Sequence, residues 1–214
     1  SSIYSQFPQY FGDQPWTAGP VYVGAFVMFL FVLGCFIVKG PLKWALLGAT
    51  IFSVLLSWGK NFMGLTDFFI DYVPMYNKFR TVEMALVIPG MVFPIIAIWG
   101  LKEVLSETVS DALLKKGLIA ALAITGGISL ILWLMPSMLL DFRSSFDAQY
   151  QLPDWYYNAL LMDRASLASA DALRSLVFIL LGAALLFWFY TSKDRKKVAT
   201  FVGIGVAVLM LVDL

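Results

Sequence analysis

The sequence contains no histidine and only one cysteine, Cys35. Without histidine, the chain lacks the side chain that most often serves as a general base and as a ligand for transition metals. A single cysteine inside an apolar run forms no intrachain disulfide and no thiolate cluster, so we interpret it as a small buried hydrophobic residue. Any catalysis must depend on carboxylates, which leaves the cofactor open and admits a divalent cation such as Mg²⁺ or Mn²⁺.

Charge is also scarce, since only 14% of the residues are charged and the formal net charge is +1. This balance offers no basic surface of the kind that binds nucleic acid. In contrast, 60% of the residues are hydrophobic and the mean hydropathy is +0.82, far above an ordinary soluble domain. Apolar runs of nearly twenty residues follow one another and predict an all-α, polytopic membrane protein whose partner is the lipid bilayer.

We expect a single transmembrane domain over residues 1–214 with about six spanning helices. The chain begins without a methionine and ends directly after an apolar run, so we expect an internal fragment of a larger protein. Pro89 and Pro94 predict a kink in the third span. Shorter helices are expected at the membrane surface, over 65–73, 102–116 and 154–174. The expected spans are 20–38, 41–58, 84–101, 117–135, 176–190 and 198–214.

The distribution of Lys and Arg predicts the orientation. Nine of the 15 lie in the three turns at 39–43, 102–116 and 191–197. By the positive-inside rule these turns face the cytoplasm. The N-terminal segment and the stretches 59–83 and 136–175 then lie on the outer face.

Charges of both signs gather with tyrosines between the second and third expected spans, over residues 58–83. Asp67 and Asp71 are four residues apart on the expected surface helix, so both carboxylates share one face and favour a cation between them. We expect a substrate site here, and a solvated loop with an internal ion pair is the alternative. The candidate residues are Lys60, Asp67, Asp71, Tyr76, Lys78, Arg80 and Glu83.

A second group of charges lies on the expected surface helix at 154–174. Arg164, Asp171 and Arg174 fall near one side of it, at spacings of seven and three residues. They would cover the charged stretch, or form only an ion pair between Asp171 and Arg174 on an interfacial helix.

Four motifs resemble the YfhO family of bacterial multi-pass membrane proteins, of the type found in Bacteroidetes. The family is similar to the integral-membrane glycosyltransferases of the GT-C type, which take a sugar from a polyprenyl-phosphate carrier and deliver it to a cell-envelope polymer or glycolipid. The resemblance implies the bacterial cytoplasmic membrane and transfer on the outer face. The motifs are Gly12–Trp16 (GDQPW), Ala18–Tyr22 (AGPVY), Trp58–Asn61 (WGKN) and, as the most specific, Val73–Glu83 (VPMYNKFRTVE).

The resemblance gives the candidate residues roles. Lys60, Lys78 and Arg80 would contact the carrier phosphate, and the carboxylates of the same stretch would bind the sugar or a cation. Enzymes of this type carry their catalytic acid in an outer loop near the N-terminus, and no counterpart is found here, so the catalytic residue is unassigned. A transporter, flippase or assembly scaffold without catalysis is the alternative, although ion-coupled transport usually needs charges inside the membrane.

Overall fold

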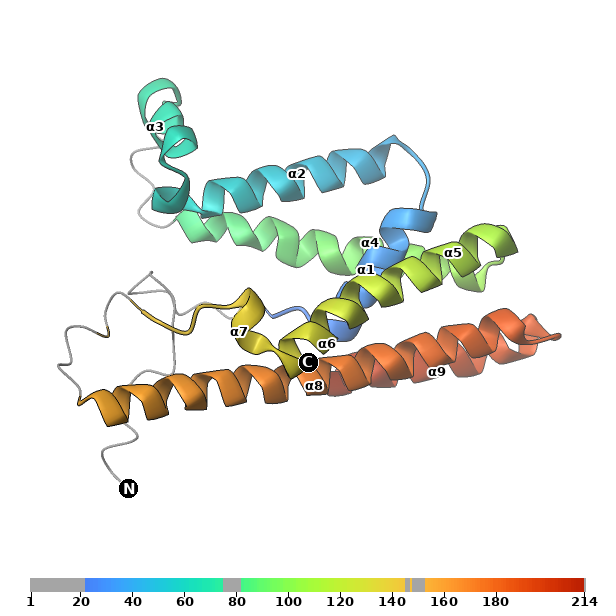
Figure 1. The fold of residues 1–214 in the computed structure, drawn as a ribbon. Coiled ribbons are helices and arrows are strands. Elements are labelled where there is room, and N and C mark those ends of the chain that lie inside the picture. Colours follow the sequence, from blue (N-terminus) through green and yellow to red (C-terminus); the bar gives the residue numbers. More distant parts are fainter. Residues whose placement is uncertain (1–21, 75–81, 145–146, 148–152, 214) are drawn as a thin grey trace.

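The computed structural model describes residues 22–74, 82–144, 147 and 153–213 (Figure 1). Every regular element in these residues is helical, which confirms the predicted all-α class. Their bounds are α1 Ala25–Ile37, α2 Pro41–Ser57, η1 Gly59–Phe62, α3 Met63–Tyr72, η3 Val82–Leu86, α4 Val87–Leu105, α5 Asp111–Ala121, η4 Leu122–Gly126, α6 Gly127–Leu134, α7 Pro136–Leu139, α8 Asp154–Thr191 and α9 Arg195–Asp213.

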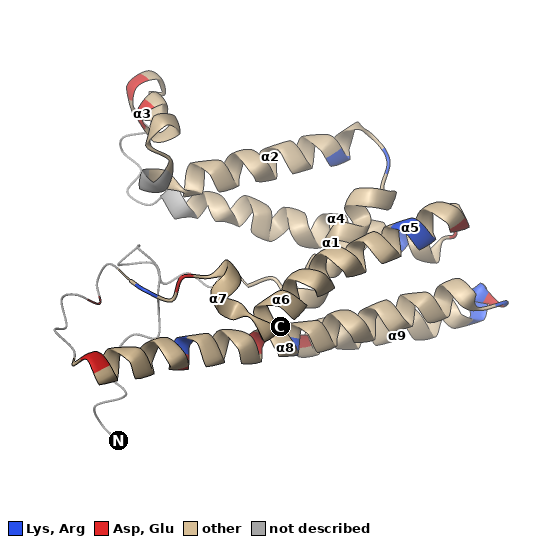
Figure 2. Cartoon of the chain, viewed as in Figure 1, with Lys and Arg blue, Asp and Glu red and all other residues tan. Residues whose placement is uncertain are grey.

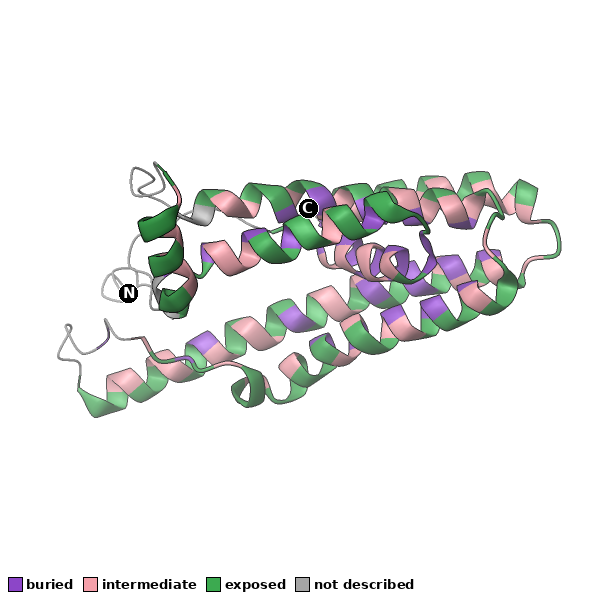
Figure 3. Cartoon of the chain, turned by 90° about the horizontal axis from the view of Figure 1, so that it is seen from above, coloured by how far each residue is buried: buried purple, intermediate pink, exposed green. Residues whose placement is uncertain are grey.

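Helix α1 forms the centre of the bundle. It carries apolar residues on every side, which is typical of a helix enclosed by others. It packs against α4, α5, α8 and α9, and Phe26, Phe29 and Leu33 are completely or almost completely buried. Buried residues lie where the helices meet and exposed ones cover the outer sides (Figure 3).

Two glycines set the distance between α1 and α4. A Cβ atom added to Gly100 would lie 2.8 Å from the Cα of Gly34, and one added to Gly34 would lie 2.6 Å from the carbonyl oxygen of Ile96. Small residues at such crossings let two backbones approach closely, as they do in membrane helix pairs.

Three helices are long and apolar enough to cross a membrane. They are Met84–Leu105, Asp111–Leu134 and Asp154–Thr191. The second of them is continuous because η4, a single π-helical turn, joins α5 to α6. Helices α1 and α2 are apolar but shorter.

The turns between α1 and α2, α4 and α5, and α8 and α9 lie at one end of the molecule (Figure 1). Lysine and arginine gather at this end (Figure 2). Arg195 binds the Asp111 carboxylate through both terminal nitrogens, over 2.7 and 3.0 Å, and so links the last two of these turns. The turns that were predicted to share one side of the membrane therefore lie together.

Several predicted helices match the structure closely. Helix α2 begins at Pro41, where the missing N–H of proline is not needed, and it ends one residue before the expected position. Helix α3 covers the predicted surface helix at 65–73 within two residues. Pro89 lies in the first turn of α4, after η3, whereas Pro94 lies inside the helix.

Two predictions about helices were wrong. No separate surface helix covers 102–116, because α4 continues to Leu105 and α5 begins at Asp111. The expected surface helix at 154–174 and the expected span at 176–190 are one helix, α8, of 38 residues. Between them Leu173–Phe178 contains neither proline nor glycine, so the helix has no local reason to end there.

Candidate functional site

Helix α3 carries the part of the predicted substrate site that the structure describes. Asp67 and Asp71 lie one turn apart on α3, as predicted, and the structure shows both exposed (Figure 2). Thr66 lies inside this helix, and its hydroxyl donates to the Gly59 carbonyl over 2.7 Å. This bond connects α3 to η1, the short helix that follows α2. Two neighbouring carboxylates on an exposed helix can accept hydrogen bonds from sugar hydroxyls or hold a cation.

The other five predicted residues lie outside what the structure describes. Tyr76, Lys78 and Arg80 belong to 75–81, and the side chains of Lys60 and Glu83 are likewise not described. Within the described residues, neither Asp67 nor Asp71 forms an ion pair. The same residues contain no group of three or more Asp, Glu, Cys or His placed to hold a metal ion.

A buried ion pair fixes the loop before α8. Arg164, 1% exposed, donates from Nη1 and Nη2 to the two carboxylate oxygens of Asp147, over 2.9 and 3.0 Å. Its Nη1 also donates to the Phe142 carbonyl over 2.8 Å, and Asp147 accepts the Ser144 N–H over 2.9 Å. A forked, charge-assisted contact of this kind holds the chain in one position.

The surroundings of Asp147 shift its pKa. Burial by itself would raise the pKa of this carboxyl group. The hydrogen bonds from Arg164, the Ser144 N–H and Tyr157 outweigh burial, so the pKa lies below its usual value. Asp147 is therefore charged at neutral pH, and the loop from Phe142 to Asp147 is held against α8 by a charged pair.

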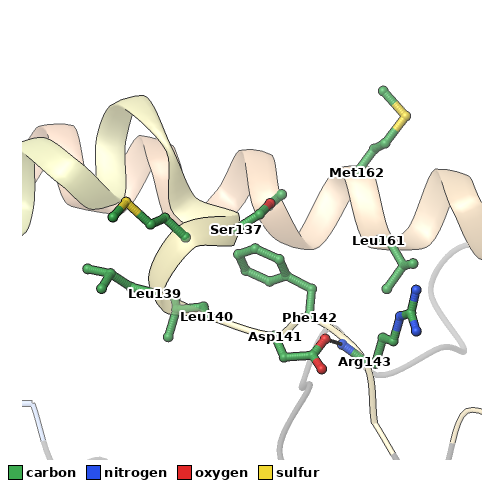
Figure 4. Close-up of a pocket in the computed structure, with 10 residues that line it drawn as sticks. Ser137, Leu139, Leu140, Asp141, Phe142, Arg143, Leu161 and Met162 are labelled. Carbon is green, nitrogen blue, oxygen red and sulfur yellow. Dashed lines mark hydrogen bonds between the residues drawn. The ribbon is translucent and has the colours of Figure 1, made fainter.

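A hollow of about 630 Å³ opens between residues 137–143 and α8 (Figure 4). Its volume is within the range of small-molecule sites. Leucines form much of its wall, together with Phe142 and Met162, while Asp141 and Arg143 supply charge. A second hollow, of about 430 Å³, lies between α6 and α8, and Leu140 lines both.

A third polar contact joins the two ends of the described chain. The Asp213 carboxylate is fully buried and accepts the Phe26 N–H and the Tyr22 hydroxyl, each over 2.9 Å. Arg174 donates to the Asp213 carbonyl over 3.0 Å. The carboxylate therefore caps the first turn of α1 from a distant part of the sequence.

The three charged residues singled out on the expected 154–174 helix lie in three different places. Arg164 pairs with Asp147, Arg174 reaches Asp213, and Asp171 lines the second hollow. In the described part of the chain, Asp171 and Arg174 form no ion pair, so that alternative was wrong. Sequence reasoning missed Asp147, Asp141 and Arg143. The signal that could have found these residues is the run Asp141–Asp147, in which three of the seven residues are charged.

No protein-family model, no curated protein and no solved structure matches the chain.

Proposed function

We propose that this chain belongs to a bacterial inner-membrane protein that transfers a sugar from a polyprenyl-phosphate carrier to a cell-envelope polymer or glycolipid. The structural observation that carries the proposal is the pair of exposed carboxylates, Asp67 and Asp71, on α3 at the end of the bundle away from the lysine-rich turns. The resemblance to the YfhO family in Val73–Glu83 supports it.

In this proposal the α3 end faces outward and the lysine-rich turns face the cytoplasm. The carboxylates bind hydroxyls of the sugar or a divalent cation. Lys60, Lys78 and Arg80, with Tyr76 and Glu83, complete the site around the carrier phosphate. A guanidinium suits this position because it neutralises the negative charge that develops on a departing phosphate.

The proposal includes six spans, the three long helices together with α1, α2 and α9. Helix α1 has 13 residues and is therefore about 20 Å long, against about 30 Å for the hydrocarbon core. It is enclosed by four other helices, so its ends do not have to reach the lipid surface. Helix α9, with 19 residues, is long enough to span.

A transporter or flippase is the second candidate, and one observation favours it. Asp213 is a fully buried carboxylate between helices, and ionisable groups in such places often mark a transport path. Both of its oxygens already accept hydrogen bonds, which suits a structural role better.

The test is the passage of radiolabelled sugar from lipid carrier to envelope acceptor in cells with and without the gene. We expect transfer only with the gene, and strongly reduced transfer when Asp67→Asn and Asp71→Asn are combined. Asp194→Asn removes an exposed carboxylate near the opposite end and should leave transfer unchanged. Equal labelling of the envelope acceptor with and without the gene would contradict the proposal.

A further inference from the structure

Two hollows lie along α8, away from the charges on α3. Leu140 lines both, so they meet at the segment after α7. The larger hollow opens between residues 137–143 and α8, and the smaller one lies between α6 and α8 as far as Ser175. A ligand in the larger hollow has one end beside the charges of Asp141 and Arg143.

The larger hollow has charges of opposite sign on one short segment. Asp141 and Arg143 both line it, and both are exposed. A carboxylate oxygen of Asp141 accepts the backbone N–H of Arg143 over 3.1 Å, which fixes the turn between them. Neither side chain takes part in an ion pair with another described residue. One cationic and one anionic group are thus presented together.

Arg164 of α8 holds the segment that contains Asp141 and Arg143 in place. Arg164 donates to the Phe142 carbonyl, just before Arg143, and makes a bidentate contact with Asp147, four residues after Arg143. A rigid segment binds a ligand with less loss of conformational entropy than a loose one.

The rest of the wall of the larger hollow is mostly apolar, whereas Ser129, Arg164, Asp171 and Ser175 also line the smaller hollow. Leu139, Leu140 and Leu161 line the larger hollow, and Leu132 and Leu167 line the smaller one. Residues 137–143 form most of the wall of the larger hollow, and Asp154–Thr191, a helix long enough to cross a membrane, supplies the rest of it. Such a wall suits a hydrocarbon chain that enters from the bilayer.

We propose that the larger hollow binds a phospholipid whose headgroup carries a primary ammonium and a phosphate. The phosphate lies against Arg143, the ammonium lies against Asp141, and an acyl chain lies along the leucines of the larger hollow. A headgroup with only negative charge would meet Asp141 unfavourably. A quaternary ammonium has no N–H to donate to that carboxylate. The proposal is independent of sugar transfer.

The test compares the purified protein with three lipids that share the same acyl chains. These are phosphatidylethanolamine, phosphatidylcholine and phosphatidylglycerol, and native mass spectrometry in detergent gives the dissociation constant of each. We expect phosphatidylethanolamine to bind about tenfold more tightly than the other two, because one charge-assisted hydrogen bond is worth about that factor.

Two variants assign the headgroup contacts. Asp141→Asn should abolish the preference for phosphatidylethanolamine over phosphatidylcholine, while Arg143→Gln should weaken all three lipids. Lys193→Gln, an exposed charge in the α8–α9 turn, is the matched control and should change nothing. Equal binding of the three lipids, tightest binding of phosphatidylglycerol, or an unchanged preference in Asp141→Asn would overturn the proposal.

A second pair of variants tests the position of the acyl chain. Ala165 lines the larger hollow, so Ala165→Leu should fill it and reduce binding of all three lipids. Ala170→Leu adds the same side chain at an exposed position of α8 and should bind like the wild type. Thermal melting of both variants shows whether each is folded. Undiminished binding by a folded Ala165→Leu variant would place the lipid elsewhere.

Discussion

The carboxylate of Asp213, at the end of α9, accepts a hydrogen bond from the backbone N–H of Phe26 in the first turn of α1, over 2.9 Å. Gly24, just before α1, has a positive φ of 86°, and a Cβ atom there would lie 2.9 Å from a carboxylate oxygen of Asp213. Glycine therefore permits both the turn and the contact. The central helix is thus capped from the other end of the described chain.

Removal of this cap should destabilise the bundle. Asp213→Ala leaves the Phe26 N–H without its partner and should lower the free energy of unfolding by about 2 kcal/mol. For a chain of this length we expect melting in detergent roughly 4–8 °C lower. Asp213→Asn keeps a hydrogen-bond acceptor and should therefore lower the melting temperature by less. The control is Asp194→Ala, an exposed carboxylate near the opposite end, and an equal effect of both alanine variants would contradict the capping role.

The ion pair of Arg164 and Asp147 gives a second prediction. Arg164→Met leaves a buried carboxylate unpaired and should cost about 3–5 kcal/mol. The double variant Arg164→Met, Asp147→Leu removes both charges and should recover much of that loss. Melting temperatures of the single and double variants measure this recovery. Additive losses of stability would show that the two side chains are not coupled.

The same pair sets a dependence on pH. The pKa of Asp147 is lowered in the folded protein, so its stabilising effect is complete above the usual aspartate pKa and is lost as the pH falls through the folded value. Stability should therefore decline on acidification below about pH 5. Asp147→Asn should show a weaker decline over the same range.

Packing between α1 and α4 gives a third prediction. In Gly100→Ala the new methyl group meets the backbone of Gly34, so the helices must separate, at a cost of about 1–3 kcal/mol. Gly90→Ala in the same helix meets nothing within 4 Å and should be neutral or stabilise by up to about 1 kcal/mol, because alanine favours helix. Melting temperatures that shift in the same direction for both would contradict the close crossing.

The sequence predicted those parts of the fold that have local signals. Pro41 marks the start of α2, and Pro74 follows the end of α3. The junction between the expected helices at 154–174 and 176–190 was placed where hydrophobicity changes, and hydrophobicity alone does not end a helix. The contacts of Arg164 with Asp147 and of Phe26 with Asp213 join residues 17 and 187 positions apart, and neither spacing leaves a pattern in the sequence.

Orientation in the membrane is the fourth prediction. In a Cys35→Ala background, single cysteines at Asn61 and Asn158 should react with an impermeant thiol reagent added outside the cell. A cysteine at Ser192, in the α8–α9 turn, should react only after the membrane is opened. The opposite labelling would place the α3 end in the cytoplasm.

Sugar transfer is tested most directly with the purified protein in vesicles that contain a radiolabelled polyprenyl-phosphate sugar and an envelope acceptor. We predict covalent transfer of label to the acceptor. Arg80→Lys should reduce it strongly without changing the melting temperature, because lysine does not reproduce the two-pronged contact of arginine with a phosphate. Movement of the labelled lipid across the bilayer with no label on the acceptor would contradict transfer and favour a flippase.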